Sequence, residues 1–154
     1  MQMQRAKILI ADDSVDDYTL LELSLREAGF DGELVWVTDG NAALEALSSE
    51  SSNGLSNGSS PESSPISSDG TRFPNLVVLD HYLPFKNSLE ILEALSFRER
   101  QASVPIVVLS SYVSGDDREN LTSAGVHSVF EKPADLDGFS ELGRVLLAFL
   151  EVEG

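Results

Sequence analysis

Short apolar runs alternate with amphipathic stretches along this chain. Four runs, rich in β-branched residues and leucine, are apolar on both faces and cover residues 8–11, 76–79, 106–109 and 128–130. Such runs are typical of strands buried in the middle of a parallel sheet. A fifth run, residues 33–37, begins with a charge and carries Trp36, which favours an edge strand with one less covered face.

Helical patterns separate these runs. The first has apolar residues three and four apart, namely Tyr18, Leu21, Leu25 and Ala28. Ser14 is its expected N-cap, and Gly29 its expected stop. The spacing predicts further helices over residues 41–47, 88–99, 116–124 and 136–150. One face of the last consists of Leu136, Phe139, Leu146 and Leu150.

Strand alternating with helix five times predicts a doubly wound α/β fold, because parallel strands need crossovers and each crossover here is helical. The expected architecture is a flavodoxin-like, five-stranded parallel sheet of order 2-1-3-4-5, with a crevice at the carboxyl ends of strands one and three.

One segment interrupts the alternation of strands and helices. Residues 48–72 are dominated by serine with glycine, asparagine and proline, which predicts a flexible insertion within a single domain spanning residues 1–154.

Composition narrows the possible partners. The formal net charge of −16 repels nucleic acid and anionic membranes, so neither is an expected partner. The absence of cysteine excludes disulfides, thiolate metal sites and a cysteine nucleophile. No apolar run approaches the length of a membrane span, and the chain opens into a strand rather than a signal peptide, so we expect a cytoplasmic protein.

Polar residues follow the expected strands where each strand ends. Strand one ends in Asp12 and Asp13, and strand three ends in Asp80. Strand four ends in Ser110 and Ser111, and strand five is followed by Lys132 and Pro133. Carboxylates sharing one crevice repel each other by about 4 kcal/mol per pair at ~4 Å and an effective dielectric of ~20. A hard divalent cation relieves that repulsion, and Mg²⁺ prefers carboxylates, waters and phosphate oxygens. The pattern predicts a site for phosphoryl chemistry.

Each of these residues also has a purely structural interpretation. A single Asp after a strand is most often a turn or cap residue. Asp16 and Asp17 are assigned to that class, since carboxylates are stabilised in the first turn of a helix. His81 is expected at the surface, and His127 and Trp36 are expected to serve packing or solvent contact. The site hypothesis depends on the acid pair, lone acid, hydroxyl and lysine occurring in order at four strand ends.

The chain resembles the receiver domain of two-component response regulators (CheY-like). The resemblance rests on ILIADDS at residues 8–14, LVVLDHYLP at 76–84, PIVVLSS at 105–111 and VFEKP at 129–133. It covers the chain apart from the serine-rich insertion. The position of that insertion and the RFPNLVVLD segment are similar to single-domain regulators of phytochrome-associated kinases.

The resemblance implies roles for the strand-end residues. Asp80 is the implied acceptor of a phosphoryl group from a phosphohistidine. Mg²⁺ is the implied cofactor, with Asp12, Asp13, Asp80 and the carbonyl of Tyr82 as its ligands. Ser110 and Lys132 are implied to bind the phosphoryl group, with Ser111 and Tyr82 as further contacts. The peptide before Pro133 is cis in relatives.

Three departures from the family pattern affect the expected mechanism. Asn87-Ser88 stands where relatives often have Asp-Gly. Val129 occupies the usual aromatic switch position, and Phe130 is offset by one residue to the opposite face of the strand. Tyr82 and Tyr112 flank the expected path of the hydrolytic water, which predicts slow autodephosphorylation. A partner surface is an equally weighted interpretation of the two tyrosines.

The expected protein is a stand-alone response regulator that acts by protein contact or as a phosphate relay or sink. It would not be an enzyme beyond Mg²⁺-dependent self-phosphorylation and autodephosphorylation. Its implied partners are a sensor histidine kinase or histidine phosphotransfer protein and an unknown downstream protein; a homodimer and a monomer are both compatible with the sequence. The rival hypotheses are a pseudo-receiver that binds without being phosphorylated and, ranked lower, a phosphohydrolase with an aspartate nucleophile.

Overall fold

The computed structural model describes residues 6–53, 74–94 and 104–153. Its strands are β1 (Lys7–Ala11), β2 (Glu33–Val37), β3 (Leu76–Asp80), β4 (Ile106–Ser110) and β5 (Ser128–Glu131). Its helices are α1 (Val15–Glu27), α2 (Gly40–Asn53), α4 (Ser88–Ala94), α6 (Gly115–Ser123) and α7 (Leu136–Glu153). Strand and helix alternate in the predicted order.

The five strands form one parallel sheet of order β2-β1-β3-β4-β5. The predicted doubly wound architecture is therefore confirmed, with β2 at one edge as expected. The register pairs Ala11 with Leu79, Asp80 with Leu109, and Ser110 with Glu131. The carboxyl ends of the central strands therefore meet at one edge of the sheet.

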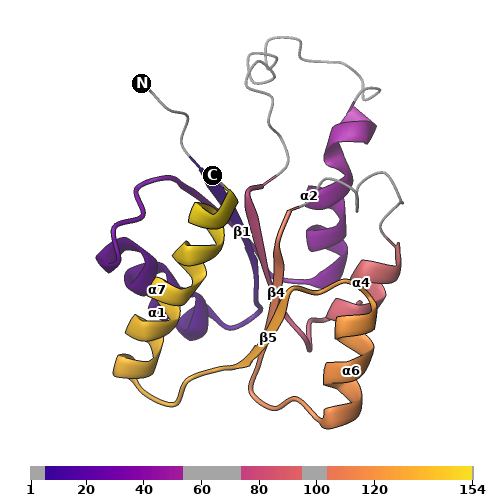
Figure 1. Cartoon of the computed structure of the whole chain (residues 1–154). Coiled ribbons are helices and arrows are strands. Elements are labelled where there is room, and N and C mark those ends of the chain that lie inside the picture. Colours follow the sequence, from indigo (N-terminus) through magenta and orange to yellow (C-terminus); the bar gives the residue numbers. More distant parts are fainter. Residues whose placement is uncertain (1–5, 54–73, 95–103, 154) are drawn as a thin grey trace.

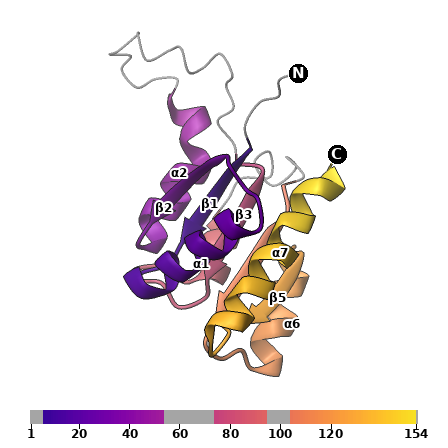
Figure 2. The ribbon, with the colours of Figure 1, turned by 90° about the vertical axis from the view of Figure 1, so that its left-hand side faces the viewer.

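Helices cover both faces of the sheet. Helices α1 and α7 lie side by side on one face, and α2, α4 and α6 lie on the other (Figures 1 and 2). Gly143 of α7 allows this approach to α1, because a Cβ there would lie 2.7 Å from the carbonyl oxygen of Ser24. The loop before α4 approaches α2 even more closely, because a Cβ on Gly40 would collide with the carbonyl oxygen of Lys86.

Alternate residues of each strand face different core clusters, as the pleat of a strand requires. Ile8 and Ile10 of β1 pack against the α1 and α7 side, whereas Leu9 packs against the α2, α4 and α6 side. All five residues of β3 are buried. This agrees with the expectation that strands apolar on both faces lie in the middle of the sheet.

Two helices extend past their predicted ends, namely α2, which was predicted to end at residue 47, and α7, which was predicted to end at residue 150 and continues to Glu153. Helix α2 continues to Asn53, so the first residues of the serine-rich segment are helical rather than part of a loop. The rest of that segment, residues 54–72, and the expected end of the helix after Ala94 lie outside the described residues. The prediction was wrong because serine is only mildly unfavourable in a helix that has already started.

Leu136, which the sequence pattern placed on the apolar face of α7, does not pack in the core. It is 66% exposed, whereas Phe139, Leu142 and Leu146 are buried. Side chains of a helix point toward its N-terminus, so the first residue of α7 projects beyond the packed turns.

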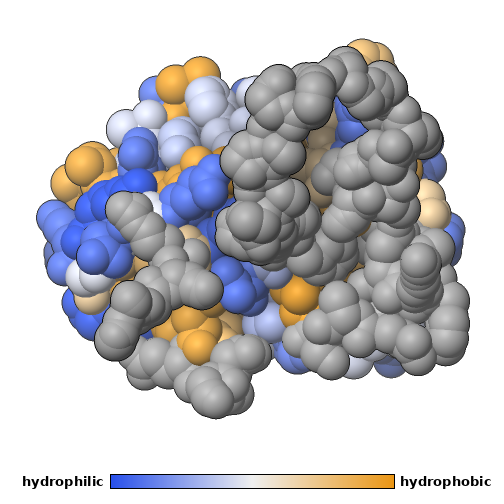
Figure 3. Space-filling model, turned by 90° about the horizontal axis from the view of Figure 1, so that it is seen from above, coloured by the Kyte–Doolittle hydropathy of each residue, from blue (hydrophilic) through white to orange (hydrophobic). Residues whose placement is uncertain are grey.

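Figure 3 shows the molecule from above, at the edge of the sheet opposite the carboxyl ends of the strands. The described part of this surface carries small hydrophobic groups among hydrophilic residues. Within the described residues, no helix combines the length and apolarity that crossing a membrane requires.

Candidate functional site

Backbone hydrogen bonds extend the sheet past the strand ends and hold the candidate residues in place. The amide of Asp12 donates to the Val37 carbonyl at 3.0 Å, and the amide of Lys132 donates to the Ser110 carbonyl at 2.8 Å. The amide of His81, which follows Asp80, donates to the Leu109 carbonyl at 3.1 Å. The polar side chains that follow three different strands therefore start from fixed backbone positions.

Three carboxylates converge at this edge. One oxygen each from Asp12, Asp13 and Asp80 lies within 4.8 Å of the other two. Asp12 and Asp80 are buried, and Asp13 is exposed. Opposite ligands of an octahedral Mg²⁺ are about 4.2 Å apart, at bond lengths of about 2.1 Å. The donor set is one that a hard divalent cation prefers, and its spacing is close to this limit, so the three residues come together as the sequence predicted.

Lys132 supplies positive charge to the same cluster. Its Nζ lies 3.0 Å from Asp12 Oδ2, 3.0 Å from Asp80 Oδ2 and 2.7 Å from Asp17 Oδ2. Burial lowers the pKa of Lys132, but these hydrogen bonds outweigh burial and raise its pKa above the usual value. The ammonium group is therefore charged throughout the physiological range and directed at the expected phosphoacceptor.

Asp12 is fixed by several contacts. Its Oδ1 accepts a hydrogen bond from the Ser14 amide at 2.9 Å, and its carbonyl accepts one from Trp36 Nε1 at 2.8 Å. Burial raises the pKa of Asp12 to about 6, because the amide of Ser14 and the ammonium of Lys132 offset desolvation only in part. The neighbouring Asp80 charge raises it further. A cation at this site would stabilise the ionised form.

The expected phosphoryl-binding residues lie around the acids. Ser110 is completely buried, and its Oγ donates to the carbonyl of Tyr112 at 3.1 Å. The amide of Tyr82 donates to Asp80 Oδ1 at 3.2 Å. Ser111 is exposed. The roles of Ser110, Ser111 and Tyr82 toward a phosphoryl group stay predictions, as does the Tyr82 carbonyl as a metal ligand.

The peptide bond before Pro133 differs from the expectation. None of the described residues follows a cis peptide bond, so the Lys132–Pro133 bond is trans. Trans is the intrinsically more stable form of an X–Pro bond, and nothing in the sequence of this turn demands the other isomer.

Asp17 belongs to the site, contrary to its assignment as a first-turn residue with a structural role only. Ser14 does cap α1, and its Oγ accepts from the Asp17 amide at 3.2 Å, as the capping pattern predicted. The Asp17 carboxylate, however, turns to Lys132. A signal was available: Asp17 lies four residues before the buried Leu21, so both lie on the face of α1 that points to the sheet.

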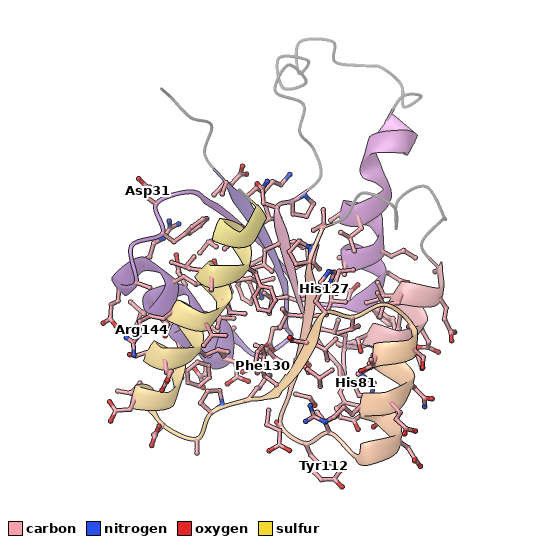
Figure 4. All side chains as sticks on the ribbon, viewed as in Figure 1. Asp31, His81, Tyr112, His127, Phe130 and Arg144 are labelled. Atoms are coloured by element: carbon pink, nitrogen blue, oxygen red, sulfur yellow. The ribbon has the colours of Figure 1, made fainter. Side chains whose placement is uncertain are left out.

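His81 was wrongly expected at the surface. It is 5% exposed, and its Nδ1 lies 2.6 Å from Oγ of the buried Ser88. Its Nε2 lies 3.7 Å from Asp117 Oδ2 in the first turn of α6, and the Tyr82 hydroxyl lies 3.5 Å from the same oxygen. Figure 4 shows His81 near the carboxyl edge, on the α6 side of the sheet. These contacts connect the end of β3 to the start of α6.

The loop between β3 and α4 forms the outer wall of the site. Phe85 is 76% exposed and has a φ of 69°, a strained region for a bulky side chain. Asn87 and Glu90 cap α4 reciprocally, each side chain accepting from the other's amide at 2.9 Å. A pocket next to the acids is lined by Asp13, Tyr82, Leu83, Pro84, Phe85, Asn87 and Glu90. The Asn87-Ser88 departure therefore provides a helix cap and a partner for His81.

The two candidate switch residues lie on opposite faces of β5, as predicted. Val129 packs against the α2, α4 and α6 side. Phe130 packs against the α1 and α7 side, toward which it points in Figure 4. Arg118 of α6 donates to the Val129 carbonyl at 3.0 Å. Val129 carries no aromatic ring that could move between an inward and an outward position.

Comparisons with known proteins identify relatives of the chain. No family model matches it. It is 30% identical over 139 residues to the probable methanogenesis regulatory protein FilR2 of Methanothrix harundinacea, covering 90% of this chain and 77% of that protein. It is 31% identical to response regulator Rcp1 of Synechocystis over 110 residues, which is 71% of this chain and 65% of Rcp1.

Solved structures of response regulators share the fold of this chain. The phosphorylated cyanobacterial phytochrome response regulator RcpA superposes with a TM-score of 0.76, at 24% identity over 98% of this chain and 97% of that one. The Mn²⁺-bound form of Rcp1 superposes with a TM-score of 0.70, at 26% identity over 94% and 93% of the two chains. With its sheet order, its cluster of strand-end acids and these relatives, the chain belongs to the family of response-regulator receiver domains.

Proposed function

We propose that this chain is a phosphorylated response regulator in which Asp80 accepts a phosphoryl group from a phosphohistidine of a sensor histidine kinase or histidine phosphotransfer protein. The observation that carries the proposal is the convergence of Asp12, Asp13 and Asp80 within 4.8 Å, with Lys132 Nζ 3.0 Å from Asp80 Oδ2. Mg²⁺ is the proposed cation, held by these three carboxylates, and when bound it would neutralise charge on phosphoryl oxygens.

The chain's own residues would supply positioning and further neutralisation. A carboxylate oxygen of Asp80 attacks phosphorus as the P–N bond to the donor imidazole breaks, and that imidazole leaves with the electron pair. The transition state is loose, so the protein contributes mainly orientation and charge stabilisation. The ammonium of Lys132, which contacts Asp80, would stabilise charge on the equatorial oxygens, and the Tyr82 amide, which donates to Asp80, would assist it.

Ser110 would couple the phosphoryl group to the surface of the domain. Its Oγ now donates to the Tyr112 carbonyl and must leave that bond to donate to a phosphoryl oxygen. This releases the segment between β4 and α6, whose helix is tied to β3 through Asp117 and to β5 through Arg118. Because Val129 cannot perform an aromatic switch, we propose that backbone and loop changes at α6 alter the surface seen by a downstream protein or a second copy.

The proposal has two rivals that a single set of measurements separates. The protein is incubated with phosphoramidate and Mg²⁺ and weighed intact. A gain of one phosphoryl group that is lost in Asp80→Ala and kept in Asp116→Ala supports phosphorylation of Asp80. Absence of any gain in the wild type supports a pseudo-receiver that only binds. Steady release of phosphate from unrelated esters supports a phosphohydrolase, a reaction for which Tyr82 replaces the second aspartate usual in such enzymes. Function as a single receiver domain stays a prediction.

A further inference from the structure

The ammonium of Lys132 and the candidate metal site share two of their carboxylates. Lys132 Nζ contacts Asp12, Asp80 and Asp17, whereas the group that fits a cation consists of Asp12, Asp13 and Asp80. Asp17 is therefore the carboxylate that contacts the lysine and lies outside the acid cluster. It also makes the shortest of the three contacts, 2.7 Å against 3.0 Å.

Occupation of the site would redistribute the three donors of the ammonium group. A cation would draw the negative charge of Asp12 and Asp80, and a phosphoryl group on Asp80 would present new oxygens to Lys132. Asp17 would then be the carboxylate left to hold the ammonium in place. We propose, resting on the proposed function, that Asp17 is a positioning residue that seats Lys132 beside Asp80 and keeps one ammonium donor directed at the incoming anion.

The fold gives Asp17 a fixed position for this role. It lies in the first turn of α1, where the Ser14 cap holds its amide, and 115 residues separate it from Lys132 in the chain. Its side chain is 31% exposed, and that of Lys132 is 10% exposed, so the bond is partly shielded from water. Asp16 stands beside it in the same turn and is exposed, which makes Asp16 a matched control for charge and helix-dipole effects.

The first experiment needs neither metal nor phosphoryl transfer. Asp17→Asn, Asp16→Asn and wild-type protein are treated with an amine acylating reagent without Mg²⁺, and labelling is read at each lysine by peptide mass analysis. Asp17→Asn removes the carboxylate that makes the shortest of the three contacts to the ammonium of Lys132, so this side chain should reach the reagent more freely and its labelling rate should rise by about threefold or more. The other two lysines, Lys7 and Lys86, serve as internal references. Equal rates at Lys132 in all three proteins would overturn the proposal.

The second experiment measures phosphoryl uptake from phosphoramidate at saturating Mg²⁺. Asp17→Asn should slow phosphoryl uptake about tenfold, because it removes one charge-assisted hydrogen bond that holds Lys132 in place. Asp16→Asn should stay close to wild type, and Asp17→Glu, which keeps the charge, should recover part of the rate. Calorimetry should give similar Mg²⁺ affinities for Asp16→Asn and Asp17→Asn, which also shows that both variants fold. A rate for Asp17→Asn equal to or above that of Asp16→Asn would contradict the proposal.

The two proposals fail in different ways. If wild-type protein takes up no phosphoryl group, phosphorylation of Asp80 is refuted, while the labelling result still decides whether Asp17 seats Lys132. If the wild type is phosphorylated and Asp17→Asn matches Asp16→Asn in both experiments, the role of Asp17 alone is refuted.

Discussion

The imidazole Nδ1 of His81 lies 2.6 Å from the hydroxyl oxygen of Ser88, and both side chains are buried. The pair joins the residue after the proposed phosphoacceptor to the first residue of α4. Ser88 stands where relatives often have glycine, so this contact is possible only because the chain departs from the family pattern at that position.

Ser88→Ala should destabilise the protein by about 1–3 kcal/mol, because it leaves a buried imidazole nitrogen without its hydroxyl partner. Urea unfolding monitored by circular dichroism measures the change. Ser140→Ala is the control, since Ser140 is not buried and its Oγ makes a long, exposed 3.4 Å contact with Glu27 Oε1. Unfolding free energies that agree for the two variants would show that the His81–Ser88 contact adds no stability.

Replacing Lys132 should expose the repulsion among the site carboxylates. Lys132→Met should lower the unfolding free energy in metal-free buffer by about 3 kcal/mol, since it removes the cation that the buried Asp12 and Asp80 share with the partly exposed Asp17. Added Mg²⁺ should then stabilise this variant more than it stabilises wild type. Thermal melts with and without Mg²⁺ test both effects, with Lys86→Met as the control. A variant as stable as wild type without metal would contradict the charge balance described above.

Mg²⁺ affinity should depend on the protonation of Asp12. Its pKa is about 6 in the folded protein, above its ordinary value of 3.8, so the carboxyl binds a proton as the pH falls through 6. A metal ligand must be deprotonated, so affinity should be constant near neutral pH and fall by about tenfold per pH unit below 6. Calorimetric titrations between pH 5 and pH 8, as approximate limits, test this. Asp12→Asn should bind more weakly with a shallower pH dependence; an equally steep profile would assign the proton to another group.

The aromatic residues at the rim should slow loss of the phosphoryl group. Tyr82 is 55% exposed and Tyr112 64% exposed, and both follow site residues by two positions. If they restrict the path of the hydrolytic water, replacing both with alanine should shorten the phosphoryl half-life severalfold in intact-mass time courses. Phe85→Ala, which removes a neighbouring exposed ring, should have less effect. An unchanged half-life in the double variant would favour the alternative role of a partner surface.

The sheet and the strand-end acids could be predicted from the sequence because both follow from local patterns. Buried parallel strands are apolar on both faces, and their carboxyl ends meet at one edge. The assignment of His81 to the surface assumed the alternation of a strand, but β3 ends at Asp80, so His81 has no such constraint. The assignment of Asp17 considered only the helix dipole, although its contact comes from a lysine 115 residues away. The burial of His81 and the contact of Asp17 with Lys132 depend on tertiary structure, and the only local indication of either was the position of Asp17 on the sheet-facing side of α1.

Trp36 has a practical consequence for experiments on this protein. It is the only tryptophan, its indole stacks on Tyr18 at 4.5 Å between ring centroids, and its Nε1 donates to the carbonyl of Asp12. Any ligand that shifts the backbone of Asp12 will disturb that indole, so intrinsic fluorescence gives an optical signal from the acid cluster without an attached dye. Replacing Tyr18 with leucine would remove the stacked ring and change the brightness of that signal while leaving its source in place.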